Sequence, residues 1–309
     1  MVKQAYDIIG DIHGYADTLE ILLCRLGYKN VNSTWSHPDG WKVVFLGDFI
    51  DRGPDIRRTL QIVRAMVDAG SACAIMGNHE YNALCYTTPD GNGGYFRPHT
   101  DGNNSQHAAT LEAFRGRTDE WTDYLDWFAT LPLFIDLGGL RVVHACWDDR
   151  AIQTLEHGGA FTVDMLHVYK TPRTAIQKVA DLLLKGPEVE LPKDLIYTDT
   201  SGIERKDARI KWWLNKPRMS YLEITMQLPL TPPDTLIPEK FHSKLCGYPE
   251  DAPPVFFGHY GYRKPAEPLA RNVACIDLGI SNEGPLCAYR WDGEQVLDLS
   301  KFVTTEGRC

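Results

Sequence analysis

The sequence predicts an α/β fold whose sheet is at least partly parallel. Short apolar runs alternate with amphipathic segments through the first half of the 309-residue chain. Five apolar runs each end at a polar residue able to bind a metal ion, and glycine directly precedes four of these residues. Strands that alternate with helices are typical of parallel sheets, in which sites form at the carboxyl ends of the strands.

Hydrophobic periodicity predicts the individual elements in chain order. Residues 5–9 form the first apolar run, and leucine recurs at helical spacing over residues 16–26. Gly27 follows directly, and glycine in this position is typical of a helix end. A second helix is predicted over residues 55–69, with one apolar face and Gly70 behind it. Further strands are predicted over residues 41–46, 72–76, 140–143, 254–257, 274–276 and 286–291.

Two segments interrupt this alternation. Residues 86–107 are rich in glycine, asparagine and other polar residues, which predicts a long loop near the site. Residues 150–245 combine two predicted helices, at 174–184 and 206–214, with proline-rich connectors such as 231–233. We expect this second segment to be a helical cap, inserted into a single domain that spans residues 1–309.

Composition and charge exclude several classes of protein. The chain has 32 basic and 41 acidic residues, a net charge of −9, which argues against binding to long nucleic acids. No run approaches the roughly 18–20 apolar residues of a membrane span, and the N-terminal residues do not resemble a secretory signal. Eight scattered cysteines without a CxxC pair are typical of reduced thiols. We therefore expect a cytoplasmic protein that binds no membrane.

Three motifs and two later histidines carry candidate metal ligands. The motifs are GDIHG at residues 10–14, GDFIDRG at 47–53 and GNHE at 77–80. The candidate ligands are Asp11, His13, Asp48, Asn78, His144 and His259. Carboxylate, amide and imidazole groups together suit Mn, Fe, Zn, Co or Ni better than Ca. Because one carboxylate can lend an oxygen to each of two ions, we expect two divalent ions that share Asp48, with Mn as the first choice.

The same motifs contain residues suited to acid catalysis and phosphate binding. His79 follows a candidate ligand directly and could protonate a leaving oxygen. Asp51 could accept a hydrogen bond from the other ring nitrogen of His79 and so fix its tautomer. Arg52 can bind a phosphoryl group through two parallel hydrogen bonds.

This order of motifs resembles the calcineurin-like metallophosphoesterases. More narrowly, it resembles the branch that contains the Ser/Thr phosphoprotein phosphatases and the symmetrical diadenosine tetraphosphate hydrolases. The resemblance is dense over residues 5–80 and then includes His144 and His259. It implies a two-sheet β-sandwich core flanked by helices, with His79 and Asp51 as the acid pair and Arg52 as a phosphate contact. It also implies a first metal bound by Asp11, His13 and Asp48, and a second bound by Asp48, Asn78, His144 and His259.

The sequence departs from the wider superfamily at one ligand position. Many members end in GHxH, whose second histidine binds the first metal, whereas this chain has glycine at position 261. This difference favours the narrower branch. The resemblance also implies a phosphate-binding arginine between the last two histidines, for which the candidates are Arg205, Arg209 and Arg218.

Simpler structural interpretations remain for several of these residues. The Asp and Asn ligands could be turn or helix-cap residues, and His144 could be a packed core histidine. Asp51 and Arg52 could form a surface ion pair. A solvated loop is the preferred interpretation for Arg97, His99 and His107, and a lid over the substrate is the alternative. The joint presence of all the motifs favours the metal site.

These observations predict a two-metal-dependent phosphoesterase that acts by in-line attack of a metal-bridging hydroxide. The first expectation is a phosphomonoester phosphatase acting on a phosphoprotein or a phosphorylated small molecule. The alternative is a symmetrical dinucleoside tetraphosphate pyrophosphohydrolase, whose substrate is a nucleotide. A non-catalytic scaffold that binds metal or phosphate is the alternative from another class.

Overall fold

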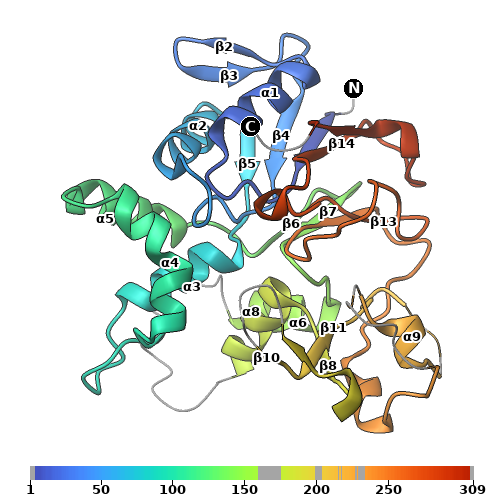
Figure 1. Cartoon of the computed structure of the whole chain (residues 1–309). Coiled ribbons are helices and arrows are strands. Elements are labelled where there is room, and N and C mark those ends of the chain that lie inside the picture. Colours follow the sequence, from blue (N-terminus) through green and yellow to red (C-terminus); the bar gives the residue numbers. More distant parts are fainter. Residues whose placement is uncertain are drawn as a thin grey trace.

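Two mixed sheets form the centre of the fold (Figure 1). A computed structural model describes residues 4–158, 175–198, 204–214, 216, 218–226, 228 and 234–306. The first sheet has the order β15-β14-β1-β4-β5 and the second the order β13-β12-β7-β6. Their strands are β1 (Tyr6–Ile9), β4 (Lys42–Phe45), β5 (Ala72–Ala74), β6 (Phe134–Asp136), β7 (Arg141–Val143), β12 (Val255–Phe257), β13 (Val273–Cys275), β14 (Cys287–Trp291) and β15 (Phe302–Thr304). The predicted α/β class with two central sheets is confirmed.

The pairing of the parallel strands places their carboxyl ends side by side. In the first sheet β1, β4 and β5 are parallel, and Ile9 pairs with Phe45, which pairs with Ala74. In the second sheet β7, β12 and β13 are parallel. The ring centroids of Phe256 on β12 and Tyr289 on β14 lie 4.9 Å apart, so the sheets pack against each other through buried side chains. The loops that follow the parallel strands therefore lie close together.

The predicted helices of the first half are present. Helix α1 (Ala16–Leu26) buries its leucine face and ends at Gly27, whose φ of 94° is left-handed. Helix α2 (Ile56–Asp68) begins at Asp55, whose side chain accepts a hydrogen bond from the amide of Arg58. A short hairpin, β2 (Lys29–Val31) and β3 (Thr34–Ser36), connects α1 to β4.

Three further helices lie together beside the first sheet (Figure 1). They are α3 (Asn78–Thr87), α4 (Asp101–Ala113) and α5 (Thr118–Phe128). The predicted loop over 86–107 is wrong at both ends, because α3 runs to Thr87 and α4 begins at Asp101. The side chain of Thr100 starts α4 by accepting a hydrogen bond from the amide of Asn103, a capping signal inside a stretch of loop-like composition.

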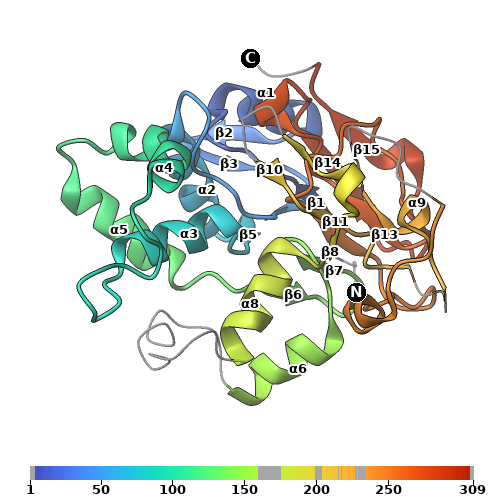
Figure 2. The same cartoon turned by 60° about the horizontal axis from the view of Figure 1, so that its bottom comes forward.

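The segment predicted as a helical cap contains strands as well as helices. Helices α6 (Asp149–Gly158) and α8 (Ala175–Lys185) lie side by side (Figure 2). The helix predicted over 206–214 is wrong, because residues there form strand β11 (Asp207–Arg209), which pairs with β8 (Glu188–Glu190). Within β11, Ala208 is buried and its neighbour Arg209 is half-buried, as expected of a strand whose side chains alternate between two faces. The short elements of this segment and of the C-terminal part are β8 (Glu188–Glu190), β9 (Tyr197–Thr198), β10 (Glu204–Arg205), β11 (Asp207–Arg209), α9 (Tyr221–Ile224) and 3-10 turns at Lys193–Leu195, Glu239–Lys244, Ile280–Asn282 and Leu299–Lys301. The predicted connector at 231–233 lies outside the described residues.

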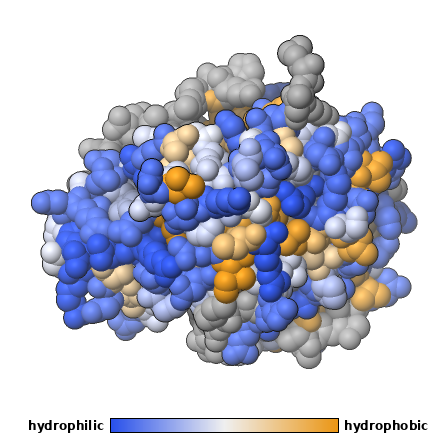
Figure 3. Space-filling model, turned by 90° about the horizontal axis from the view of Figure 1, so that it is seen from above, coloured by the Kyte–Doolittle hydropathy of each residue, from blue (hydrophilic) through white to orange (hydrophobic). Residues whose placement is uncertain are grey.

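The surface of the molecule is largely polar on the face seen from above (Figure 3). Hydrophobic residues form small patches on this face, between larger hydrophilic areas. Among the residues that the structure describes, no helix is both long and apolar enough to span a membrane.

Candidate metal centre

The predicted ligands lie at the carboxyl ends of parallel strands from both sheets. The loop after β1 carries Asp11 and His13, the loop after β4 carries Asp48, and Asn78 begins α3 after β5. His144 follows β7 and His259 follows β12. Two sheets that are separate in hydrogen bonding therefore contribute to one site.

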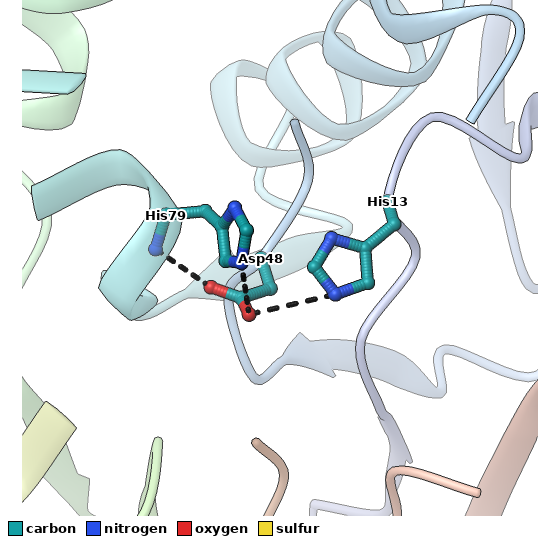
Figure 4. A group of neighbouring side chains, drawn as sticks. All are labelled: His13, Asp48 and His79. Atoms are coloured by element: carbon teal, nitrogen blue, oxygen red, sulfur yellow. Dashed lines mark hydrogen bonds and ion pairs between the residues drawn. The ribbon is translucent and has the colours of Figure 1, made fainter. Parts of the chain in front are cut away.

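A first group of ligand atoms consists of His13, Asp48 and His79 (Figure 4). One ligand atom of each residue lies within 4.8 Å of the others. Asp48 Oδ2 is 3.6 Å from His13 Nε2 and 3.9 Å from His79 Nε2. The backbone amide of His79 donates to Asp48 Oδ1 at 2.9 Å. The sequence interpretation placed His79 beside the metals as an acid, and the geometry brings its Nε2 to the same carboxylate.

A second group consists of Asp48, His144 and His259. His144 Nε2 lies 3.4 Å from Asp48 Oδ1. The side-chain oxygen of Asn78 is 3.0 Å from His144 Nε2 and 2.6 Å from His259 Nδ1. Asp48 belongs to both groups, one oxygen toward each, as expected of a carboxylate shared by two ions. A buried cluster of imidazole nitrogens with carboxylate and amide oxygens suits a divalent transition metal.

Hydrogen bonds orient two of the imidazoles. His13 Nδ1 lies 3.0 Å from the carbonyl oxygen of Ile50, and His144 Nδ1 lies 2.7 Å from that of Leu46. A carbonyl oxygen can only accept, so each Nδ1 donates, and the lone pair of a neutral ring then lies on Nε2, toward Asp48. Metal-binding histidines are commonly oriented in this way.

Burial and local charge set the protonation of these residues. Burial and Arg52 lower the pKa of His13 to about 3, and burial and Arg209 hold the pKa of His259 well below its ordinary value. Burial would raise the pKa of Asp48, but the nearby histidines, His144 foremost, hold it well below its ordinary value. Neutral His13 and His259 beside an ionised Asp48 are in the forms that a metal requires. The pKa of His144 is raised, because its attraction to Asp48 exceeds the effect of burial.

Asp11 lies at the edge of this cluster and in neither group. The backbone amide of His259 lies 3.3 Å and 3.0 Å from its two carboxylate oxygens. Burial, together with the charges of Asp277 and Asp48, raises the pKa of Asp11 well above its ordinary value. Its role as a metal ligand stays a prediction, as do the roles of the other ligands.

The loops that carry these residues are strained. Five of the predicted site residues have a left-handed backbone, with φ between 48° and 69°: His13, Asp48, Asp51, Arg52 and His259. Residues other than glycine rarely adopt this conformation, and it clusters at functional sites. The adjacent glycines permit close approach, because a Cβ at Gly258 would overlap Asp11 Oδ1.

Glu80 links two of the motifs, a role that the sequence analysis missed. Its buried carboxylate accepts hydrogen bonds from the backbone amides of Asp48, Phe49 and Gly77 at 2.8, 2.8 and 3.0 Å, and from Ile50 at 3.4 Å. Burial and the charge of Asp48 raise the pKa of Glu80 to about 7. Its place as the last residue of GNHE was the only signal in the sequence.

The predicted acid pair is in direct contact. His79 Nδ1 lies 2.6 Å from Asp51 Oδ2, and its Nε2 lies 3.3 Å from Arg52 Nη2. Arg52 Nη1 donates to the hydroxyl of Ser281 at 2.7 Å. Burial would raise the pKa of Asp51, but hydrogen bonds from His107 and His79 hold it well below its ordinary value. Hydrogen bonds therefore join Arg52, His79 and Asp51 in one chain beside Asp48.

Helix α4 brings His107 into the site, where the preferred sequence interpretation placed a solvated loop. His107 is buried, and its Nδ1 lies 2.8 Å from Asp51 Oδ1. The solvated-loop interpretation of His107 is therefore wrong, because α4 begins six residues earlier and turns this side chain inward. His99 lies 2.8 Å from the carbonyl oxygen of Tyr86, and Arg97 donates to Asn103 and Gln106.

Arg209 is the candidate arginine that reaches the cluster. Its Nη1 donates to the carbonyl oxygen of His259 at 3.2 Å, and its guanidinium lies 5.5 Å from the ring centroid of Tyr260. Arg205 and Arg218 are exposed. Pairing of β11 with β8 places Arg209 here, which sequence reasoning that assumed a helix could not predict.

The two-sheet core carries a buried cluster of carboxylate and imidazole groups that suits divalent metal ions. The model of the family described as calcineurin-like phosphoesterase matches residues 6–222, and the chain belongs to this family. The predicted membership of this family is confirmed.

Curated relatives match only part of their length. The bis(5'-nucleosyl)-tetraphosphatase PrpE (asymmetrical) of Oceanobacillus iheyensis is 45% identical over 73 residues, which cover 24% of this chain and 29% of the relative. The protein of the same name from Bacillus subtilis is 40% identical over 76 residues, which cover 25% and 31%. The match thus spans less than a third of these relatives.

Solved structures match over most of the chain. A protein serine/threonine phosphatase from Saccharomyces cerevisiae has a TM-score of 0.49 and 12% identity. The match covers 100% of this chain and 81% of the phosphatase. A cold-active protein-tyrosine phosphatase from a Shewanella species has a TM-score of 0.46 and 16% identity, covering 98% and 80%.

Proposed function

We propose that the chain hydrolyses phosphoesters with two divalent ions, for which Asp48 would be a shared ligand. The observation that carries this proposal is that Asp48 belongs to both groups of ligand atoms, with one oxygen directed to each. Mn²⁺ is the first choice, and Fe, Zn, Co and Ni suit the same donors. The proposed ligands are Asp11, His13 and Asp48 for one ion, and Asp48, Asn78, His144 and His259 for the other.

When bound, the two ions would supply an activated water and neutralise charge on the phosphoryl group. The chain supplies the remaining groups. Arg52 and Arg209 hold the phosphoryl oxygens through their guanidinium groups. In this structure His79 Nε2 accepts a hydrogen bond from Arg52 Nη2 at 3.3 Å. With substrate bound, Arg52 donates to the phosphoryl oxygens instead, and the protonated ring of His79 gives its Nε2 proton to the leaving oxygen as the P–O bond breaks. Asp51 accepts the Nδ1 proton of His79 in a hydrogen bond and orients the ring.

The first substrate class that we propose is a phosphomonoester of a protein or a small molecule. The second is a dinucleoside tetraphosphate, which the names of the PrpE relatives favour. A cavity of about 560 Å³ also favours it. Arg263 and Lys264 line this cavity, and so does Asn282, the neighbour of the Ser281 that binds Arg52. Two cations that line this cavity suit phosphates beyond the one attacked.

A panel of substrates with Mn²⁺ tests these proposals. It compares p-nitrophenyl phosphate, phosphoserine and phosphotyrosine peptides, mononucleotides and diadenosine tetraphosphate, with His79→Asn as a control. Preference for monoesters supports a phosphatase. Preference for diadenosine tetraphosphate supports the second class, and its products distinguish a symmetrical cut, which yields two diphosphates, from an asymmetrical cut, which yields a tri- and a monophosphate. Absence of metal-dependent release from every substrate would refute hydrolysis and favour a binding scaffold.

A further inference from the structure

Helix α4 contributes two hydrogen-bond donors to Asp51. His107 Nδ1 lies 2.8 Å from Asp51 Oδ1, and the hydroxyl of Thr110 lies 2.5 Å from the same oxygen. The other oxygen of Asp51 lies 2.6 Å from His79 Nδ1. Asp51 therefore lies between two imidazole rings, each of which occupies a different oxygen of the carboxylate.

This arrangement is buried. Asp51, His107 and Thr110 are 3%, 5% and 0% exposed. Water therefore cannot replace a donor that is removed, and a buried carboxylate depends on its donors. His107 Nε2 has no hydrogen-bond partner among the described residues. Because the carboxylate oxygen of Asp51 accepts, His107 Nδ1 is the donor of their hydrogen bond.

Helix α4 also holds the backbone of Asp51. The amide of Asp51 donates to Thr110 Oγ1 at 3.0 Å, and its φ of 66° is one that only surrounding contacts maintain. Thr110 and His107 lie three residues apart and thus on one face of α4. This face of α4 therefore binds both the main chain and the side chain of Asp51.

We propose that His107 is a positioning residue for phosphoester hydrolysis, which holds Asp51 so that His79 keeps Nε2 directed at the leaving oxygen. His107 acts through Asp51, and the role rests on the proposed function of His79 as the general acid. Without the His107 donor, Asp51 Oδ1 loses one of its two side-chain donors, and the carboxylate can turn away from His79. The reactive orientation of His79 is then populated less often.

The test compares His107→Phe with His107→Asn on two substrates. Phenylalanine keeps a ring and removes the donor, whereas the asparagine amide can place an N–H close to the position of Nδ1. On a phosphoserine peptide, a poor leaving group, we expect His107→Phe to lower kcat/KM by about 10–100-fold and His107→Asn to restore most of it. On p-nitrophenyl phosphate, whose leaving group departs without a proton, we expect only a small loss. A merely structural role would lower kcat/KM on both substrates by a similar factor.

The matched control is Tyr86→Phe. The hydroxyl of Tyr86 donates to Asn104 on α4 at 2.9 Å, and its ring centroid lies 5.2 Å from that of His107. The variant removes one hydrogen bond to α4 and keeps the ring beside His107. It should leave unchanged the ratio of kcat/KM on the phosphoserine peptide to kcat/KM on p-nitrophenyl phosphate. If His107→Phe fails to fold, Thr110→Val removes the other donor to the same oxygen, together with the acceptor of the Asp51 amide, and should show the same dependence on the leaving group.

His79→Asn separates the two proposals. If this variant shows no dependence on the leaving group, the general-acid function itself is wrong. If it does, His107→Phe should add no further loss on the phosphoserine peptide in the His79→Asn background, because both residues act at one step. A further loss there, or equal losses of His107→Phe on both substrates, would refute the positioning role alone.

Discussion

Glu80→Gln tests whether one buried carboxylate holds two of the metal-binding motifs together. Oε2 of Glu80 accepts from the amides of Asp48 and Gly77, and Oε1 accepts from those of Phe49 and Ile50. Glutamine has the same shape but replaces one oxygen by an NH2 group. Whichever position the NH2 takes, two buried N–H donors face it and lose their acceptor.

The cost follows from these two lost hydrogen bonds. A buried donor without a partner costs about 1–3 kcal/mol, so the expected loss in the free energy of unfolding is about 2–6 kcal/mol. The free energy of unfolding of a typical domain is only about 5–15 kcal/mol. Urea denaturation measures this loss. Because Asp48 lies directly on the released loop, elemental analysis of the purified variant should also show less bound metal per chain.

The control is Glu120→Gln. The carboxylate of Glu120 pairs with Arg57 at 3.0–3.1 Å, and both side chains are about 30% exposed. A pair of this kind contributes about 0.2–1 kcal/mol, and the variant should retain its metal. If Glu80→Gln were no more destabilising than Glu120→Gln and bound as much metal, Glu80 would not hold the two motifs.

Three further predictions concern the metals, the phosphate and the core. Asp48→Asn should lower both activity and the number of metal ions bound per chain, and full metal content would contradict a shared ligand. Arg209→Lys keeps the charge but loses the fork of donors, so the KM for a phosphoester should rise by about tenfold while metal content stays constant; an unchanged KM would exclude this contact. Burial raises the pKa of Asp7 to about 6, with Arg290 opposing it, so the folded state binds more protons than the unfolded state between about pH 4 and pH 6. The contribution of Asp7 to stability therefore falls as pH rises through this window. The free energy of unfolding of Asp7→Asn relative to the unmodified chain should rise over the same window by at most about 3 kcal/mol, and a difference independent of pH would contradict the assignment.

Local sequence predicted the parts of the site that follow directly from a strand. His144 and His259 could be predicted because each follows an apolar run, and the structure brings both to Asp48. The same reasoning failed for Arg209, which lies in β11. Its helical interpretation was wrong because β11 is held by pairing with β8, a segment whose contribution no local pattern reveals.

The sequence by itself determined the parallel strands of the two central sheets, the order of the motifs and the donor types at the strand ends, because hydrophobic periodicity and glycine positions are local properties of the chain. Only the tertiary structure decided that Glu80 holds the Asp48 loop, that His107 reaches Asp51 across 56 positions, and that Arg209 meets His259. These contacts depend on how helices and strands distant in sequence pack around one buried cluster. Burial makes each of them matter, since a charge without donors is costly where water cannot reach it.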